Sequence, residues 1–556
     1  MDRKKKTETT DEPVAKKVKT SCLVSDRMNF NLDMAERNRL DLPKNQRPMK
    51  KLDLAMGKAT LFEGITGDNN NLSARKTPAE SGWLPNVVQN FRRKNRFPIN
   101  DTDQEMFNII TDYLDLFAVT KHKSHRDIYV AHILNHLISS RNTVLGNHMA
   151  LQGDTVSEEL IESSRDQGFV RTSCLIMCPF KKDGYDVVQR LIGMVFGKGV
   201  KNVRHIKRFE EEFVDGGKVD NELLNDDFKE LLSGNNDDCF RIGISISKKA
   251  LKLYEPFDTA DLILCSPLGL RMILEKERDE SHYVSSLQIV VVDGVDVMLQ
   301  QNWENLSIVF DKMHSLPSNI LADISRVKSL YLEGNAKYYS QLLMFSQYQH
   351  ELFAGLMFER SLNYRGLVLH QPRQEGMLSN IEIPLCQEFL RFNVEGADDP
   401  SLSRFNFFAN KFGNCLVPHT CIVIPSYFDF VRLRNYFKRH EESFVSLHEY
   451  AEKKKVKRAR DMFFHELKKI LLVTERFHYF HRYELKGIER LIFYQAPSHP
   501  SFYHEFINMG KLSKKRFSAS LLYSKNDRLR LCNIFGTSMA NSILNSEKDV
   551  QAIVSE

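Results

Sequence analysis

The chain has 556 residues, of which 42% are hydrophobic and 27% charged, a composition typical of globular proteins. This length predicts two to four domains with full-sized hydrophobic cores. The sequence contains no run of 18 apolar residues, which excludes a conventional membrane-spanning helix. Its first 20 residues lack the apolar segment of a secretion signal, so we expect no secretion.

The nine cysteines form no C-x-x-C pair, and Cys174 and Cys178 have no second ligand pair nearby. His132, Asn135 and His136 share helical spacing but lack a third ligand at a suitable distance in the sequence. We therefore expect no bound metal and no other cofactor. An odd number of cysteines fits a reducing compartment.

Basic charge is concentrated in two stretches, although the net charge of the chain is only +6. Residues 430–490 contain 16 Lys and Arg against nine Asp and Glu, and residues 1–60 contain 15 against nine. Segregated positive charge favours a polyanion as partner. Ordinary solvated faces give the same pattern, and charge alone does not separate these alternatives.

Residues 1–80 are polar and basic and have no sustained hydrophobic period, so we expect a mostly disordered leader. Two lysine clusters near its start resemble a bipartite nuclear import signal. They consist of Lys4, Lys5, Lys6, Lys16, Lys17 and Lys19. The leader therefore predicts a nuclear protein.

From Trp83 onward the sequence becomes globular. Residues 104–118 and 127–139 have the period of amphipathic helices. Short apolar runs then recur, each followed by a helical pattern, as in a parallel sheet covered on both faces. These runs are residues 174–178, 261–265, 289–293, 327–332, 420–424, 470–474, 491–494 and 518–523.

Eight such runs are too many for one comfortable sheet, and proline and glycine accumulate between residues 370 and 400. The sequence therefore predicts an α/β protein with two tandem lobes, residues 81–375 and 380–556. Residues 208–238 are acidic and rich in Asn and Gly, which indicates an insertion within the first lobe.

Two α/β lobes in tandem raise the possibility of an ATP-driven motor, which needs a G-x-x-x-x-G-K-[ST] loop to hold phosphates. The sequence lacks this string. The nearest match, residues 57–60, is Gly-Lys-Ala-Thr and follows no hydrophobic strand. We therefore expect no P-loop.

The run 289–306 has the form of a strand, an acid, a turn and a helix. Asp293 stands where a motor would hold Mg²⁺, but Gly294 replaces the carboxylate that would orient the attacking water. Asp296 is expected to cap the following helix. Residues 498–516 contain no H-R-x-G-R arginine finger. Loss of three separate requirements predicts a motor fold without hydrolysis.

Several long strings resemble the digestive organ expansion factor family, the U3 small nucleolar RNA-associated protein 25 homologues. They are GNNDDCFRIGI (234–244), ADLILCSPLGLRMIL (260–274), DGVDVMLQQNWENL (293–306), HTCIVIPSYFDFVRLRNYFK (419–438), LLVTERFHYFHRYELKGIERLIFYQAP (471–497) and LLYSKNDRLRL (521–531). The resemblance covers roughly residues 80–556. It implies a degenerate DEAD-box-like fold of two RecA-like lobes and a nucleolar role in the small-subunit processome.

The resemblance also implies RNA contacts at the SPLGLR box (266–271) and at the strand end that carries Thr474. The residues themselves indicate further contacts, because aromatic and basic side chains alternate at 427–438 and 476–483, and residues 453–460 form the densest charge cluster. The candidate RNA-binding residues are Arg271, Tyr427, Arg432, Arg434, Lys438, Lys453, Lys454, Lys455, Arg458, Arg460, Thr474, Arg476, His478 and Arg482.

The missing motifs predict a protein that does not hydrolyse ATP. The resemblance implies a scaffold for pre-ribosomal RNA processing toward 18S rRNA, with pre-ribosomal or U3 RNA and other processome proteins as partners. A divergent ATP-dependent RNA helicase and a scaffold that contacts only proteins are the alternatives. An aromatic and arginine-rich loop suits a protein hot spot as well as RNA, so the sequence leaves the partner class open.

Overall fold

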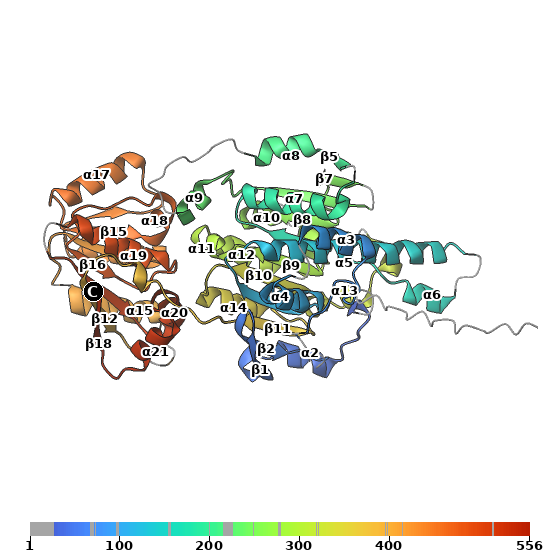
Figure 1. Cartoon of the computed structure of the whole chain (residues 1–556), viewed down its shortest axis with the longest axis horizontal. Helices are drawn as coiled ribbons and strands as arrows, with labels where there is room; N and C mark the ends of the chain where they lie inside the picture. Colours follow the sequence, from blue (N-terminus) through green and yellow to red (C-terminus); the bar gives the residue numbers. More distant parts are fainter. Residues whose placement is uncertain are drawn as a thin grey trace, which may run out of the picture.

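The computed structural model describes residues 27–555 with short gaps and shows two lobes side by side along the long axis (Figure 1). Within the described residues, the first lobe holds an 11-stranded sheet and the second a 7-stranded sheet. The predicted pair of tandem α/β lobes is confirmed. The gaps are residues 67–71, 73, 96–98, 154–156, 200, 215–225, 248–249, 276–279, 319, 321, 395, 397–398, 414 and 514–515.

The first sheet has the order β1-β2-β11-β3-β10-β9-β4-β8-β6-β7-β5. Its central strands, from β11 to β8, are parallel to one another. The strands are β1 (Met49–Leu54), β2 (Gly57–Glu63), β3 (Asp115–Val119), β4 (Cys174–Met177), β5 (Val203–Arg204), β6 (Arg241–Ile246), β7 (Leu251–Glu255), β8 (Leu262–Cys265), β9 (Ile289–Asp293), β10 (Gln341–Ser346) and β11 (Gly366–His370).

Helices cover both faces of this sheet, so its central strands are apolar throughout. Along β4, Cys174 and Ile176 pack into one core cluster, and Leu175 and Met177 pack into the other. The helices of this lobe are α2 (Met34–Asp41), α3 (Pro85–Lys94), α4 (Asp101–Thr111), α5 (Ser124–Ala150), α6 (Glu158–Ser163), α7 (Lys181–Phe196), α8 (Ile206–Phe213), α9 (Asp226–Leu232), α10 (Pro267–Leu274), α11 (Val295–Gln300), α12 (Trp303–Lys312), α13 (Ser329–Leu332) and α14 (Glu351–Arg360).

Part of the predicted leader belongs to the first lobe. The hairpin β1–β2 adds to the sheet because β2 pairs antiparallel with β11, and α2 begins with a capping box formed by Asp33 and Glu36. The prediction of disorder up to residue 80 is therefore wrong for this segment. Leu61 and Phe62 are buried on opposite faces of the sheet, and this apolar run is too short to stand out from its polar neighbours. The six lysines of the predicted import signal lie outside the described residues.

The second sheet has the order β14-β15-β13-β16-β17-β12-β18, in which only β18 runs antiparallel to its neighbour. Its strands are β12 (Leu385–Arg391), β13 (Thr420–Ile424), β14 (Phe444–Leu447), β15 (Ile470–Thr474), β16 (Arg490–Phe493), β17 (Ser518–Tyr523) and β18 (Val550–Ser555). Its helices are α15 (Pro400–Phe412), α16 (Tyr427–Arg439), α17 (Lys453–Phe464), α18 (Glu475–His481), α19 (Ser501–Asn508), α20 (Arg528–Phe535) and α21 (Thr537–Asn545).

Two predicted elements differ from the structure. Residues 104–118, predicted as one helix, divide into the end of α4 and the buried strand β3. The run 327–332, predicted as a strand, contains helix α13 instead. In the described part of the chain, no helix has both the length and the apolarity needed to cross a membrane.

Candidate functional site

The loop between β3 and α5 occupies the position where α/β proteins bind phosphate, between the carboxyl end of a parallel strand and a helix N-terminus. It reads Thr120-Lys121-His122-Lys123 and contains no glycine. Residues 57–60, which are the nearest match to a P-loop in the sequence, lie in the hairpin strand β2. The sequence pattern predicts a helix through β3, so it does not reveal the loop 120–123.

Asp293 at the end of β9 is buried and faces the first turns of α5. Arg126 donates to one carboxylate oxygen from Nε at 2.7 Å, and the Tyr129 hydroxyl donates to the same oxygen at 2.8 Å. His125 Nε2 lies 3.1 Å from the other oxygen. Burial alone would raise the pKa of Asp293, but the Arg126 guanidinium brings it well below its ordinary value.

Arg126 joins Asp293 to two further acids. Its Nη2 donates to Asp183 at 2.9 Å, and its Nη1 donates to Asp186 at 2.9 Å. All three nitrogens of the guanidinium are therefore bound to carboxylates, in a fork geometry that suits arginine. A fixed cation of the chain thus neutralises the carboxylates at this point.

Gly294, the next residue, has φ of 78° and ψ of 43°, a left-handed conformation that favours glycine. A Cβ at this position would lie 3.3 Å from Pro179. Asp296 does not cap α11 as predicted. Its carboxylate accepts a hydrogen bond from the Gln347 amide at 3.2 Å, at the end of β10, and burial raises its pKa to about 7.

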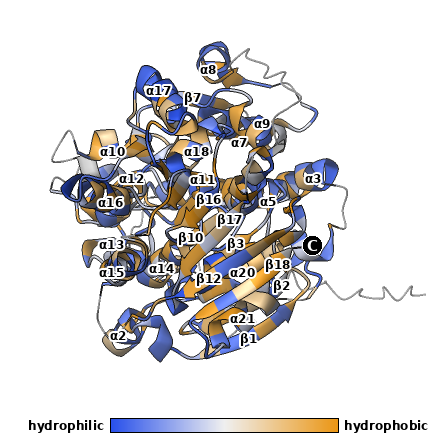
Figure 2. Ribbon diagram, turned by 90° about the vertical axis from the view of Figure 1, so that its left-hand side faces the viewer, coloured by the Kyte–Doolittle hydropathy of each residue, from blue (hydrophilic) through white to orange (hydrophobic). Residues whose placement is uncertain are grey.

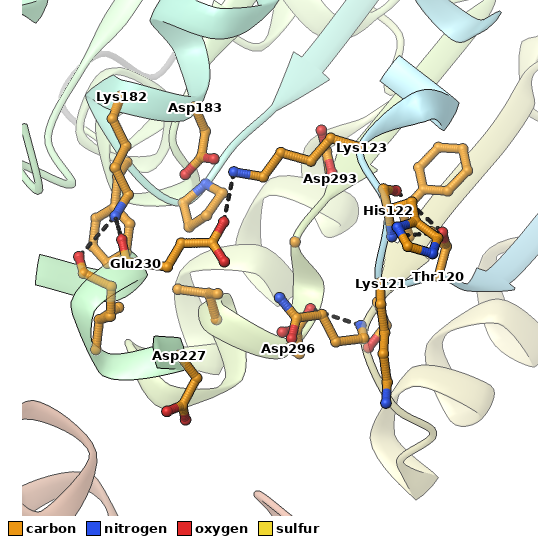
Figure 3. A pocket seen from close by; sticks show the side chains of 18 of the residues that line it. Thr120, Lys121, His122, Lys123, Lys182, Asp183, Asp227, Glu230, Asp293 and Asp296 are labelled. Carbon is orange, nitrogen blue, oxygen red and sulfur yellow. Dashed lines mark hydrogen bonds and ion pairs between the residues drawn. The ribbon is translucent and has the colours of Figure 1, made fainter. Parts of the chain in front are cut away.

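Helix α9 of the acidic insertion lies over this loop, between the two lobes (Figures 1 and 3). Lys123 pairs with Glu230 at 2.7 Å, and Lys182 Nζ donates to the carbonyls of Glu230 and Leu231 at 2.6 and 2.7 Å. On the side of the second lobe, Arg482 pairs with Asp227 at 3.1 Å. A cavity of about 130 Å³ remains between these groups.

The lobes are also joined directly. Arg530 of α20 is buried and donates from Nε to Glu351 of α14 at 2.7 Å. Burial opposes ionisation of Glu351, but the Arg530 guanidinium lowers the pKa of its carboxyl to about 2. The Asn533 amide donates to the Gln349 carbonyl at 2.6 Å. These contacts fix the relative position of α14 and α20.

The run 476–483, predicted as an exposed RNA-binding loop, forms helix α18 and the residues just after it, and this prediction of exposure is wrong. His478 is buried, and its Nε2 lies 2.8 Å from Glu505. Arg482 also pairs with Glu505. Arg476 donates to the Gln300 carbonyl of the first lobe at 3.0 Å. The basic groups of this run are thus neutralised by acids and carbonyls that lie distant in the sequence.

Two more candidate RNA-binding residues have partners within the chain. Thr474 caps α18 by accepting from the Phe477 amide at 3.4 Å, and its hydroxyl donates to Glu449 at 2.8 Å. Arg271 on α10 donates to Asn305 at 2.8 Å and also forms ion pairs on the surface of the first lobe.

The remaining candidates lie on α16 and α17 of the second lobe. On α16, Tyr427 and Arg434 are half-buried, Arg432 donates to the Ser401 hydroxyl at 2.8 Å, and Lys438 is exposed. On α17, Arg460 donates to the Glu484 carbonyl at 3.3 Å. The exposed basic residues of α17 are Lys453, Lys454, Lys455, Lys457 and Arg458.

Helix α17 buries one face, formed by Val456, Ala459 and Phe463, and presents the basic face to solvent at the outer margin of the second lobe (Figure 2). Of the candidates on α16 and α17, only Lys438, Lys453, Lys454, Lys455 and Arg458 are exposed. Among the described residues, no cluster of three or more His, Cys, Asp and Glu side chains is arranged to hold a metal ion.

Two family models match the chain. The model described as "UTP25, NTP hydrolase-like domain" matches residues 112–368, and the model described as "Utp25, C-terminal domain" matches residues 377–553. These two ranges correspond to the part of the first lobe from β3 to β11 and to the second lobe.

Curated relatives are similar over most of the chain. The U3 small nucleolar RNA-associated protein 25 homolog of Homo sapiens is 35% identical over 504 residues, which cover 86% of this chain and 66% of the relative. The U3 small nucleolar RNA-associated protein 25 of Schizosaccharomyces japonicus is 34% identical over 77% of this chain and 68% of the relative. The chain spans somewhat less than two thirds of the length of the mammalian relatives.

Solved structures of DEAD-box proteins are similar at low sequence identity. The yeast splicing factor Prp28 aligns over 93% of this chain and 96% of its own, with 12% identity and a TM-score of 0.30. A DEAD box protein from Methanococcus jannaschii aligns over 88% and 98%, with 10% identity and a TM-score of 0.28. The two family models and the curated relatives show that the chain belongs to the U3 small nucleolar RNA-associated protein 25 family.

Proposed function

We propose that this protein is a non-catalytic, RNA-associated scaffold of the small-subunit processome in the nucleolus, which acts in pre-ribosomal RNA processing toward 18S rRNA. The names of its relatives associate them with U3 small nucleolar RNA, and family membership supports the same association here. Pre-ribosomal RNA or U3 RNA and other processome proteins are the expected partners.

The bonding of Asp293 carries the proposal that the protein does not hydrolyse ATP. A motor needs this carboxylate to hold Mg²⁺, whereas here both of its oxygens are bound by side chains of α5. Arg126 supplies a permanent positive charge at this carboxylate. The loop 120–123 also lacks the glycines through which backbone amides surround phosphates.

An ATPase assay tests this part of the proposal. The purified chain should release no phosphate above background from ATP and Mg²⁺, with or without RNA. Asp293→Ala serves as the control, because a true activity would require this carboxylate. Hydrolysis by the wild type that disappears in Asp293→Ala would contradict the proposal and favour a divergent helicase.

The exposed basic residues of α16 and α17 carry the proposal that the protein binds RNA. Lys438, Lys453, Lys454, Lys455 and Arg458 are solvent-exposed and suit contacts with a phosphate backbone. We do not extend the proposal to Arg476, His478 and Arg482, because internal partners already bind these side chains.

Ultraviolet crosslinking with peptide mapping separates RNA binding from a purely protein-bound role. We expect crosslinked peptides within residues 427–460, and fewer of them when the three lysines 453–455 are replaced by alanine. An absence of crosslinks throughout residues 427–482 would favour a scaffold that contacts only proteins.

The lysine clusters of the first 20 residues carry the proposed nuclear import. A fluorescent fusion of the full chain should accumulate in nucleoli, and replacement of Lys16, Lys17 and Lys19 by alanine should shift it toward the cytoplasm. A fusion that stays nucleolar after replacement of both clusters would contradict an import role for these residues.

A further inference from the structure

Two exposed aromatic rings lie beside the basic residues of the second lobe. Phe428, in the first turn of α16, is 86% exposed, the highest value among the large hydrophobic side chains of the described residues. Tyr450, in the loop between β14 and α17, is 66% exposed. An aromatic ring left so open suggests a binding surface, because burying it would be favourable.

Tyr450 packs against a cluster of other aromatic rings. Its ring meets Tyr427 at 5.1 Å in an edge-to-face arrangement, and Tyr427 in turn contacts Phe430 at 5.5 Å. His448 lies 5.1 Å from Phe430. The cluster sits where β13 and β14 end, the edge of a parallel sheet at which α/β proteins bind their ligands. Because these rings are already packed together, a ligand would pay little entropy to order them.

Positive charge surrounds this aromatic cluster. Lys453, Lys454 and Lys455 follow Tyr450 after two residues, at the start of α17. Two nearby acids are bound internally, since Asp429 pairs with Arg404 at 3.0 Å and Glu449 accepts from Thr474 at 2.8 Å. A third, Glu452, is exposed and pairs with Lys455 at 3.1 Å. The three lysines outnumber this one exposed acid, so the net charge beside the rings is basic.

This combination favours RNA over a protein partner. Lysine is depleted in protein interfaces relative to the rest of the surface, whereas aromatic rings next to Lys and Arg are typical of surfaces that bind single-stranded nucleic acid. A duplex offers only phosphates and groove edges to such a surface, since its bases are stacked on one another. Only an unpaired base can stack face to face on an exposed ring.

We propose that Phe428 and Tyr450 form a stacking platform for the bases of unpaired RNA, while the lysines at the start of α17 contact the adjoining phosphates. The inference rests on the proposed RNA-binding function and names its ligand as single-stranded RNA. The platform distinguishes unpaired from paired RNA and not one base from another, because every unpaired base presents a face on which a ring can stack.

Fluorescence anisotropy with a short oligouridylate and an RNA duplex of equal length tests the platform. Phe428→Ala and Tyr450→Ala should each weaken binding of the single strand about tenfold, as expected for the loss of one stacked base. Binding of the duplex should change less than about twofold. Phe358→Ala, an exposed aromatic of α14 in the first lobe, serves as the matched control and should affect neither ligand.

Two further variants distinguish stacking from general apolar contact. Phe428→Leu keeps an apolar side chain but removes the aromatic face, so it should weaken single-strand binding almost as much as Phe428→Ala. Phe428→Trp should retain affinity, and the fluorescence of the introduced indole should be quenched when the oligouridylate binds. Retention of affinity by Phe428→Leu would contradict stacking.

The possible outcomes separate the two proposals. If the wild type binds neither RNA, the proposed RNA-binding function fails. If it binds both RNAs and the Phe428 and Tyr450 variants lose nothing, or lose both ligands equally, only the stacking platform fails. Loss of a processome protein from the Phe428→Ala variant with unchanged RNA affinity would assign these rings to a protein partner.

Discussion

Asp293 and Asp296 stand three residues apart and are both buried, yet their surroundings act on them in opposite directions. Arg126 holds the first as an anion, whereas the second has no comparable cation and its pKa is raised by burial to about 7. One carboxyl group is thus stabilised in its charged form and the other in its neutral form.

The raised pKa of Asp296 makes the stability of the fold depend on pH. Its carboxyl keeps a proton that the unfolded chain releases, so its contribution weakens as the pH rises from about 4 through about 7. Asp296→Asn should therefore stabilise the fold more at about pH 8 than at about pH 5, with a difference on the order of 2 kcal/mol in the free energy of unfolding. Thermal denaturation followed by circular dichroism measures both values.

Asp293→Asn provides the matched comparison. The low pKa of Asp293 contributes stability that is present above about pH 4 and is lost only as the pH falls further, so this variant should be destabilised equally at about pH 5 and about pH 8. A stabilised Asp293→Asn, or an Asp296→Asn with no pH dependence, would contradict this assignment of charges.

Among the substitutions considered, replacement of Arg126 should lower the free energy of unfolding most. Arg126→Met leaves the buried carboxylates of Asp293 and Asp183 without its guanidinium, whereas Asp186 keeps Arg190 at 2.9 Å. We expect a loss of about 3–5 kcal/mol in the free energy of unfolding. Arg75→Met is the control, because Arg75 and Asp101 form an exposed ion pair at 2.8 Å that should contribute less than about 1 kcal/mol. Urea denaturation of both variants measures the difference, and similar losses would contradict a special role for Arg126.

At the scale of elements, helix α9 contacts both lobes, which its own sequence gives no reason to expect. Its Glu230 meets Lys123 of the first lobe, and its Asp227 meets Arg482 of the second. The hydrogen bond from Lys123 lowers the pKa of Glu230, which keeps this carboxylate charged. The Glu230 carboxylate and the carbonyls of α9 thus bind the ammonium groups of Lys123 and Lys182 on the first-lobe side of the cavity.

Loss of these two ion pairs should increase the distance between the lobes on the side of α9, while Arg530 and Glu351 still hold α20 to α14. In the variant with Asp227→Asn and Glu230→Gln, we expect a lower efficiency of energy transfer between dyes attached to the two lobes, and the wild type should approach the same value at high salt because the pairs are partly exposed. Glu210→Gln, an exposed acid of α8 in the same insertion, should change nothing. Equal efficiency in all three proteins would show that α9 does not hold the lobes together.

The elements that were predicted correctly are those whose apolar runs have clear ends. Strands β4, β8, β9, β13, β15, β16 and β17 match predicted runs to within one residue, because both of their faces are buried. Strand β3 is not apparent from the sequence, because only three residues separate it from the end of α4 and it continues the apolar pattern of that helix. Helix α18 was misread because nothing local reveals that Glu505 and Asp227 will bind its basic groups. The loop 120–123 could have been found only by first recognising β3.

At the scale of the whole molecule, the pair of buried Arg530 and half-buried Glu351 joins the lobes most directly. Arg530→Met leaves Glu351 without its cation, at a cost of about 1–3 kcal/mol in the free energy of unfolding. It should also split one calorimetric transition into two, because the lobes then unfold separately. Arg391→Met, which removes contacts within the second lobe, should leave the number of transitions unchanged. A single transition in Arg530→Met would place the coupling elsewhere.

The hairpin β1–β2 also has a consequence for how the chain folds during synthesis. Strand β2 pairs with β11, so the edge that it presents has no native partner until roughly 300 further residues have been made. At typical translation rates of about 5–20 residues per second, this interval lasts roughly 15–60 s. The hairpin is therefore an open edge strand on the ribosome for longer than most of the chain, and it is the segment of the first lobe that most needs protection by a chaperone.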